Sequence, residues 1–314
     1  MRILLTGTTG FVGSLILPEL LEQGHEVRCL VRSPERFSPP TGELEVVVAD
    51  LVEGSGVAQA LAGMEVAYYL VHSMERPRKA TAAALRSFAE RERRAARGFA
   101  QAATRAGLWR IVYLGGLLPH ARDPSEHLAS RAEVEELLLA AVPDSVALRS
   151  SIVIGARSRS FRLLVRLIER LPVLPLPPWR EHRTAPIDAR DLAAMLVRAC
   201  APELPGGRSY DIAGPTTLSY EQLLAGIAEA MLVDRPIVKI GCEGEELIAR
   251  LAAAIAEEQP ELIVPLMDGL ADDLLPRAAP EETAAIFAVR LHSLESAIEH
   301  ALRQWEEVEP LAAR

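Results

Sequence analysis

The residues with the clearest chemical potential stand at the start of the chain, in the segment Thr6-Gly7-Thr8-Thr9-Gly10-Phe11-Val12-Gly13. An apolar run precedes this segment and apolar residues at helical spacing follow it, so the glycines occupy a turn between a buried strand and a helix. There Gly7 allows a tight turn, Gly10 lets the backbone approach a diphosphate, and Gly13 allows close packing of the helix. The amino end of the helix offers N–H donors to phosphate oxygens. The segment predicts a dinucleotide-binding turn, although similar glycines also occur in plain turns.

The elements that must position this turn are alternating strands and helices. Short apolar runs typical of buried strands recur at 3–5, 27–31, 45–48, 66–71, 110–114 and 146–148, with helical segments between them. This alternation predicts an α/β fold, a doubly wound parallel sheet of the Rossmann kind. We place the dinucleotide-binding core at residues 1–155. Residues 156–314 are expected to form a smaller, mostly helical substrate-side region, packed on the core and ending in acidic helices.

The end of the second strand bears on the choice of cofactor. Folds that prefer NAD place an acidic residue there, on the ribose 2′-hydroxyl, whereas this chain has Arg32. A guanidinium matches the 2′-phosphate of NADP, while the plain alternative is a solvated surface arginine. We therefore expect NADP as the cofactor, with NAD as the other candidate.

Further candidates follow the other strands, because ligands gather at the carboxyl edge of an open parallel sheet. Asp50 is suited to accept a hydrogen bond from an adenine amino group, and equally to cap a helix. His72 is a candidate cofactor or substrate contact, and equally a loop histidine. The remaining predicted cofactor contacts lie in the glycine turn and at the strand ends: Thr9, Phe11, Val12, Leu51, Val71, Ser73 and Ser151.

Composition restricts the class of protein. No apolar run approaches the ~20 residues that cross a bilayer, so we expect a soluble cytoplasmic protein without membrane contact. Cys29, Cys200 and Cys242 lie far apart without histidine or cysteine neighbours, which favours free thiols over a disulfide or a metal site.

Charge and aromatic content argue against nucleic acid as a partner. Aromatic residues are 4% of the chain and no basic stripe interleaves with them. The net charge of −9 arises beyond residue 242, where 16 acidic residues face 5 basic ones. We expect a small-molecule substrate or none.

Taken with Ala49-Asp50-Leu51 and the segments 110–114 and 210–215, the glycine turn resembles that of the extended and atypical short-chain dehydrogenase/reductases. The NmrA-like NAD(P)-binding proteins are the most similar, and the likeness covers roughly residues 1–240. It implies an oxidoreductase acting on a small carbonyl, quinone or activated alkene. Active members of the superfamily use a serine together with a Tyr-x-x-x-Lys pair. In this chain lysine occurs only at positions 79 and 239, so no such pair exists.

Two hypotheses account for the missing pair. The positions that correspond to the tyrosine and lysine hold His127 and Arg131, while Gly115 or Gly116 stands at the serine position. In the first hypothesis His127 is the general acid and Arg131, on the same helix face, holds the ribose, with His72 as a further catalytic candidate. In the second, these residues are cofactor contacts or surface residues of a non-catalytic NAD(P)-sensing regulatory or scaffold protein. The family also suggests a homodimer through a long helix at 80–107.

Overall fold

The computed structural model describes residues 1–39, 44–71, 88–241, 245–257, 267, 270 and 272–311. The chain forms two compact units that interleave along the sequence. The first comprises Met1–Gly116, Ala129–Arg149 and Ala193–Tyr210, and the second comprises Leu117–Leu128, Ser150–Leu192 and Asp211–Arg314. The boundary expected near residue 155 falls inside a segment of the second unit and stays a prediction.

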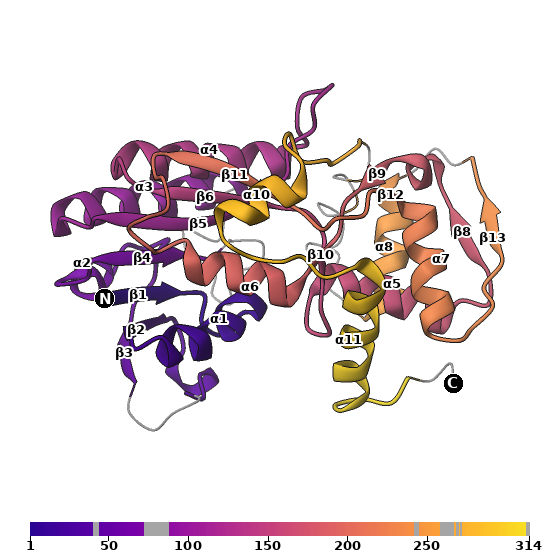
Figure 1. Cartoon of the computed structure of the whole chain (residues 1–314), viewed down its shortest axis with the longest axis horizontal. Coiled ribbons are helices and arrows are strands. Elements are labelled where there is room, and N and C mark those ends of the chain that lie inside the picture. The colour runs from indigo at the N-terminus through magenta and orange to yellow at the C-terminus, as the bar shows by residue number, and fades with distance from the viewer. Residues whose placement is uncertain are drawn as a thin grey trace. The chain divides into compact units, whose positions relative to one another are not determined.

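A seven-stranded sheet with the order β11-β6-β5-β4-β1-β2-β3 is the framework of the first unit (Figure 1). The pairs β1–β2, β1–β4, β2–β3 and β4–β5 are parallel, as expected for strands joined by helices. The predicted doubly wound α/β fold is confirmed. The strands of this sheet are β1 (Arg2–Thr6), β2 (Glu26–Val31), β3 (Glu45–Val48), β4 (Val66–Tyr69), β5 (Arg110–Gly116), β6 (Val146–Ser150) and β11 (Arg208–Ile212).

Helices cover both faces of this sheet, as the alternation of the sequence requires. They are α1 (Phe11–Glu22), α2 (Val57–Leu61), α3 (Phe88–Ala106), α4 (Glu126–Ala141) and α6 (Ala189–Arg198). Successive side chains of β4 point to opposite faces of the sheet, because side chains alternate along a strand. Tyr69 packs edge to face on Phe99 of α3 with ring centroids 5.0 Å apart, whereas the Tyr68 hydroxyl donates to the Leu196 carbonyl of α6.

The apolar face of α3 is used within the chain. Ala95, Phe99 and Ala103 are buried in one cluster with strand residues such as Ile111. The predicted helix began at residue 80, and its part at 80–87 lies outside the described residues. These three side chains are therefore not available for the expected dimer contact through α3.

The second unit has a core of its own. Its helices are α5 (Arg159–Arg170), α7 (Tyr220–Ala230), α8 (Glu245–Ala256), α10 (Pro280–Ile286) and α11 (Leu294–Glu306). Three pairs of short strands accompany them: β7 (Val153–Ile154) with β10 (Ile187–Asp188), β9 (Arg183–Thr184) with β12 (Leu218–Ser219), and β8 (Leu174–Leu176) with β13 (Ile237–Lys239). Leu294, Ile298, Leu302 and Trp305 of α11 pack into this core, so this helix of the acidic tail is amphipathic.

Helix α8 packs through small residues. Ala252, Ala253 and Ala256 are buried beside Leu163 of α5, whereas Leu251 remains 56% exposed. The helical face that carries the leucine therefore differs from the face that is buried.

Two further expectations concern thiols and membrane spans. Cys29 and Cys200 are buried free thiols, and burial raises the pKa of Cys29 to about 12. Cys242 lies outside the described residues. Within the described chain, no helix combines the length and the apolar character that crossing a membrane requires.

Candidate cofactor-binding site

The glycine turn joins the end of β1 to the start of α1. Gly7 has a φ of +71°, and the amide of Gly10 donates to the Gly7 carbonyl at 2.9 Å to close the turn. The first helical hydrogen bond runs from the Ser14 amide to the Gly10 carbonyl. The amides of Phe11, Val12 and Gly13 therefore precede the hydrogen-bonded helix, and α1 has no side-chain cap. Such an end can bind an anion through backbone donors and the helix dipole.

The glycines are required by close backbone contacts. A Cβ atom at Gly7 would lie 2.6 Å from the Leu70 carbonyl oxygen, which belongs to the chain just after β4. A Cβ atom at Gly13 would lie 2.2 Å from the Gly7 carbonyl oxygen, so α1 could not pack against the turn. At Gly10 the nearest atom would be 3.1 Å away, a tighter contact than most but not a collision with a second chain segment. Gly7 and Gly13 thus shape the turn, and exposed Gly10 and Thr9 form its open side.

Thr8 adds a polar group that sequence reasoning missed. Its side chain is 3% exposed, and its hydroxyl has no hydrogen-bond partner among the residues that the structure describes. A buried hydroxyl without a partner costs about 1–3 kcal/mol. The turn therefore combines unfilled backbone donors, glycine-only close approaches and an orphaned hydroxyl, and this combination fits a bound dinucleotide. The signal was available, because Thr8 lies between the first two glycines of the motif.

Arg32 and Asp50 follow two neighbouring strands of the sheet, β2 and β3. Arg32 directly follows β2 and is exposed. Asp50 follows β3, and its Oδ1 accepts the amides of Val52 at 2.8 Å and Glu53 at 3.0 Å. Asp50 thus forms a turn, as its capping alternative implied, and its contact with adenine stays a prediction. Leu51 is buried in the core cluster of the first unit.

After β4 the described chain reaches only part of the predicted site. Val71 is half-buried against the core of the first unit. His72 and Ser73 lie outside the described residues. Their predicted contacts with cofactor or substrate stay predictions.

Arg131 is held by neighbours in α3 and β5. Its guanidinium lies over the Tyr113 ring, 5.2 Å from the centroid, donates to the Leu114 carbonyl, and stands 3.9 Å from a Glu92 carboxylate oxygen. Tyr113 in turn donates its hydroxyl to the Arg131 carbonyl at 3.1 Å. Burial by itself would lower the pKa of Arg131, but Tyr113 and Glu92 outweigh it and raise that pKa. Sequence reasoning missed Glu92 and Tyr113, which come from other elements.

His127 and Ser151 complete the list of predicted residues. His127 lies in the first turn of α4 and is half-buried. Ser151 directly follows β6, and its hydroxyl is 3.1 Å from the hydroxyl of the fully buried Thr184. Thr184 was not predicted, since no motif marks β9 in the sequence.

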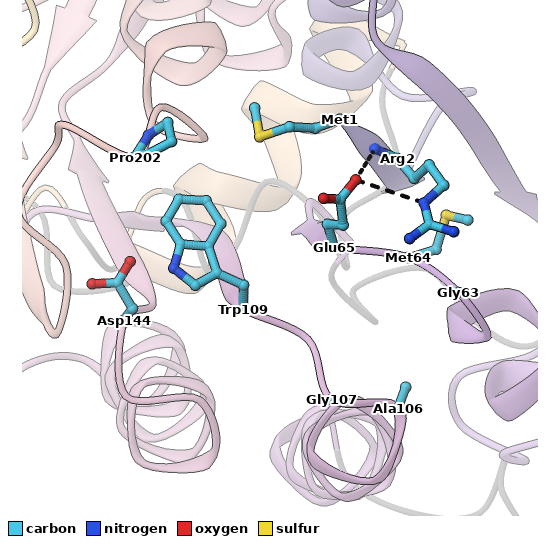
Figure 2. A pocket seen from close by; sticks show the side chains of 10 residues that line it. All are labelled: Met1, Arg2, Gly63, Met64, Glu65, Ala106, Gly107, Trp109, Asp144 and Pro202. Atoms are coloured by element: carbon cyan, nitrogen blue, oxygen red, sulfur yellow. Dashed lines mark hydrogen bonds and ion pairs between the residues drawn. The ribbon is translucent and has the colours of Figure 1, made fainter.

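A hollow of about 680 Å³ opens at the opposite edge of the sheet, where the strands begin. Figure 2 shows the Trp109 indole and the Asp144 and Glu65 carboxylates around it. Glu65 accepts the Arg2 amide at 2.8 Å. No predicted site residue within the described chain lines this hollow. Because ligands of parallel sheets collect at the carboxyl ends of the strands, we do not take it as the cofactor site.

The comparison with protein families addresses this turn. Residues 7–145 match a family of NAD(P)H-binding proteins, and this stretch contains the three glycines of the turn and the strands β2 to β5. Residues 7–145 therefore carry an NAD(P)H-binding domain. The predicted resemblance is thereby confirmed at the level of an NAD(P)-binding domain, and the match does not distinguish NAD from NADP.

Individual relatives extend the likeness over much of the chain. The ceramide reductase of Caulobacter vibrioides is 27% identical over 73% of this chain and 70% of its own length. A mitochondrial NADH dehydrogenase (ubiquinone) 1 alpha subcomplex subunit 9 of Arabidopsis thaliana is 24% identical over 69% of this chain and 54% of its own length. The fold is similar to that of a dTDP-glucose 4,6-dehydratase double mutant from Streptomyces venezuelae, solved with NAD bound. That match has a TM-score of 0.72 and 17% identity, and it covers 98% of each chain.

Proposed function

We propose that the protein is an NADP(H)-dependent oxidoreductase that acts on a small carbonyl, quinone or activated alkene. The observation that carries this proposal is the glycine turn. Helix α1 has no side-chain cap, and the Thr8 hydroxyl has no hydrogen-bond partner among the described residues. The turn residues hold the diphosphate, and the bound nicotinamide supplies hydride chemistry. The ceramide reductase aligns with 73% of this chain, and its name supports the reductive direction.

Arg32 supports the choice of NADP. It is exposed just after β2, at the position where folds that prefer NAD place an acidic residue. We expect Arg32→Glu to weaken NADP binding by about 10- to 100-fold, because hydrogen bonds to charged groups contribute ~1.5–3 kcal/mol. NAD binding should change little. Calorimetry with both cofactors measures the ratio, and Arg105→Glu, an exposed arginine of α3, is the control. An unchanged ratio removes Arg32 from the assignment.

His127 is our candidate for the proton donor. A hydride reduction of a carbonyl needs one proton at the oxygen. The chain has no Tyr-x-x-x-Lys pair to supply this proton, and α4 contains no lysine. An imidazole is suited to this transfer at neutral pH. Arg131 is then a positioning residue, since its guanidinium contacts Tyr113, Leu114 and Glu92.

The decisive experiment separates binding from turnover. NADPH is titrated first, and its oxidation is then followed over a panel of carbonyls, quinones and activated alkenes. His127→Ala should lower kcat by ~10²- to 10⁴-fold with the NADPH affinity retained. The exposed His120→Ala is the matched control and should leave kcat unchanged. Background oxidation over the whole panel, or full activity of His127→Ala, refutes the catalytic mechanism.

The second candidate function is a non-catalytic NAD(P)-sensing regulatory or scaffold protein. The engagement of Arg131 with Glu92 and Tyr113 favours it, because the residue at the lysine position is committed to the fold. The name of the plant relative, a subunit of a larger complex, agrees with a scaffold role. This function requires NADPH binding without turnover and a partner affinity that depends on the cofactor. Equal partner binding by the apo, NADP⁺ and NADPH forms refutes it.

A further inference from the structure

Arg183 of β9 forms an ion pair with Asp273, a residue that is distant in the sequence. The Asp273 Oδ1 accepts the Arg183 amide at 2.7 Å, while Oδ2 accepts Arg183 Nε at 2.9 Å and Nη2 at 2.7 Å. Both side chains are partly open to water, at 58% and 38% exposure. One backbone and two guanidinium donors thus converge on a single anion.

The segment that carries Asp273 is fixed against β9 on both sides of this contact. The Leu274 amide donates to the Arg183 carbonyl at 3.0 Å, and Leu274 forms a parallel bridge with Thr184. The neighbouring Asp272 lies 3.5 Å from Arg122. His182 Nδ1 is 2.6 Å from the Leu270 carbonyl oxygen. The carboxylate is therefore presented to Arg183 by several anchors and not by a loose surface contact.

This ion pair adjoins a predicted functional residue. Arg183 and Thr184 are successive residues of β9, and the Thr184 hydroxyl is 3.1 Å from that of Ser151. Ser151 follows β6 at the edge where ligands of this fold gather. Side chains alternate along a strand, so β9 presents Thr184 to Ser151 and Arg183 to the acidic segment.

The same set of donors is what a phosphate or carboxylate ligand requires. Guanidinium groups bind phosphate through paired N–H donors, and a neighbouring backbone amide adds a further directed donor. We infer that the Arg183 guanidinium and its backbone amide form an anion-binding site that the chain's own Asp273 occupies. The inference goes beyond the proposed function and does not depend on it.

Two physical arguments support an occupied subsite. A tethered group competes with free ligands at an effective concentration on the order of mM. Burial by itself would raise the pKa of Asp273, but the hydrogen bonds and charge of Arg183 dominate and lower that pKa. The carboxylate consequently stays ionised at neutral pH and continues to occupy Arg183.

Binding of inorganic pyrophosphate, measured by calorimetry, tests the inference. NADP⁺ is added at saturation so that the probe cannot bind at the glycine turn. We expect the wild type and the control Glu281→Ala, which removes an exposed carboxylate of α10, to take up the probe weakly or not at all. Asp273→Ala should bind it about ten-fold more tightly or better, because the competing carboxylate is gone. Adding Arg183→Gln to Asp273→Ala should abolish this gain.

Three outcomes would overturn the inference. They are wild-type binding as tight as that of Asp273→Ala, no gain in Asp273→Ala, and a gain that persists without Arg183. Asp273→Asn, which keeps the side-chain volume and one acceptor, replaces the alanine variant if the latter does not fold. The NADPH titration is independent of Arg183, so its failure refutes the proposed function while the pyrophosphate result still reports on the subsite.

Discussion

The two edges of the parallel sheet in the first unit use hydrogen bonds in opposite ways. At the edge where strands begin, the fully buried guanidinium of Arg110 donates to the carbonyls of Asp144, Ala199, Ala201 and Leu204 and to the Asp144 carboxylate. At the edge where strands end, the α1 amides and the Thr8 hydroxyl lack such acceptors among the described residues. Filled donors indicate a structural role, and unfilled donors indicate a ligand.

The hollow in Figure 2 shows that the volume of a cavity does not by itself identify the functional site. It lies at the amino edge beside Trp109, whose ring is 4.4 Å from the Arg110 guanidinium carbon. Its carboxylates already have arginine partners, Glu65 with Arg2 and Asp144 with Arg110. The comparison therefore favours the glycine turn as the functional edge.

Arg110→Met should have the largest effect on stability. The variant leaves several backbone carbonyls without their donor, and each buried polar group that loses its partner costs about 1–3 kcal/mol. The Asp144 carboxylate, which is 41% exposed, can instead be solvated by water. The NADPH affinity of the folded protein should not change. Chemical denaturation and an NADPH titration measure the two effects, with the exposed Arg105→Met as control. A loss of cofactor affinity without a loss of stability would reverse the roles of the two edges.

Gly13→Ala should have the largest effect on function. Its Cβ atom would lie 2.2 Å from the Gly7 carbonyl oxygen, so the turn must shift and the α1 amides would no longer point toward the diphosphate. We expect NADPH affinity to fall by about 100-fold or more, equivalent to ~2.7 kcal/mol. Gly98→Ala in α3, whose Cβ would meet no atom within 4 Å, should instead stabilise the protein by up to ~1 kcal/mol. Normal NADPH binding by Gly13→Ala would contradict the assigned site.

Thr8→Val sharpens the comparison at the level of one hydroxyl. If the cofactor supplies the missing partner, the variant should bind NADPH about 3- to 10-fold more weakly, which matches a net hydrogen bond of ~1 kcal/mol. The apo protein should be equally stable or more stable, and Thr8→Ser should restore affinity. Thermal unfolding with and without NADPH measures both. A less stable apo protein with unchanged affinity would show that the hydroxyl is satisfied within the fold.

The amino edge also has a modest pH response. Burial, followed by the charge of the amino terminus, lowers the pKa of His25 below that of the unfolded chain. The unfolded state then binds the proton more readily, so the His25 contribution is complete above pH ~6.5 and is lost as pH falls toward the folded pKa. Denaturation midpoints between pH 5 and 8 should show this trend, and His25→Asn should flatten it. A slope that is the same in both proteins assigns the effect elsewhere.

Local signals allowed most of the sheet to be predicted. The apolar runs at 3–5 and 45–48 and the glycine spacing define β1, β3 and the turn from neighbouring residues alone. The environment of Arg131 could not be predicted in this way, because Glu92 and Tyr113 are brought to it by two other elements. The contact between Ser151 and Thr184 likewise depends on a two-residue strand without a motif.

The contacts around Arg131 also limit how this chain could be converted to the usual chemistry of its superfamily. Introducing Tyr-x-x-x-Lys by His127→Tyr with Arg131→Lys would take away the flat group that covers the Tyr113 ring. It would also leave the buried Glu92 facing a compact ammonium that reaches fewer acceptors. A working redesign would therefore begin in α3, with a neutral residue at position 92, before any change at the two positions that give the motif its name.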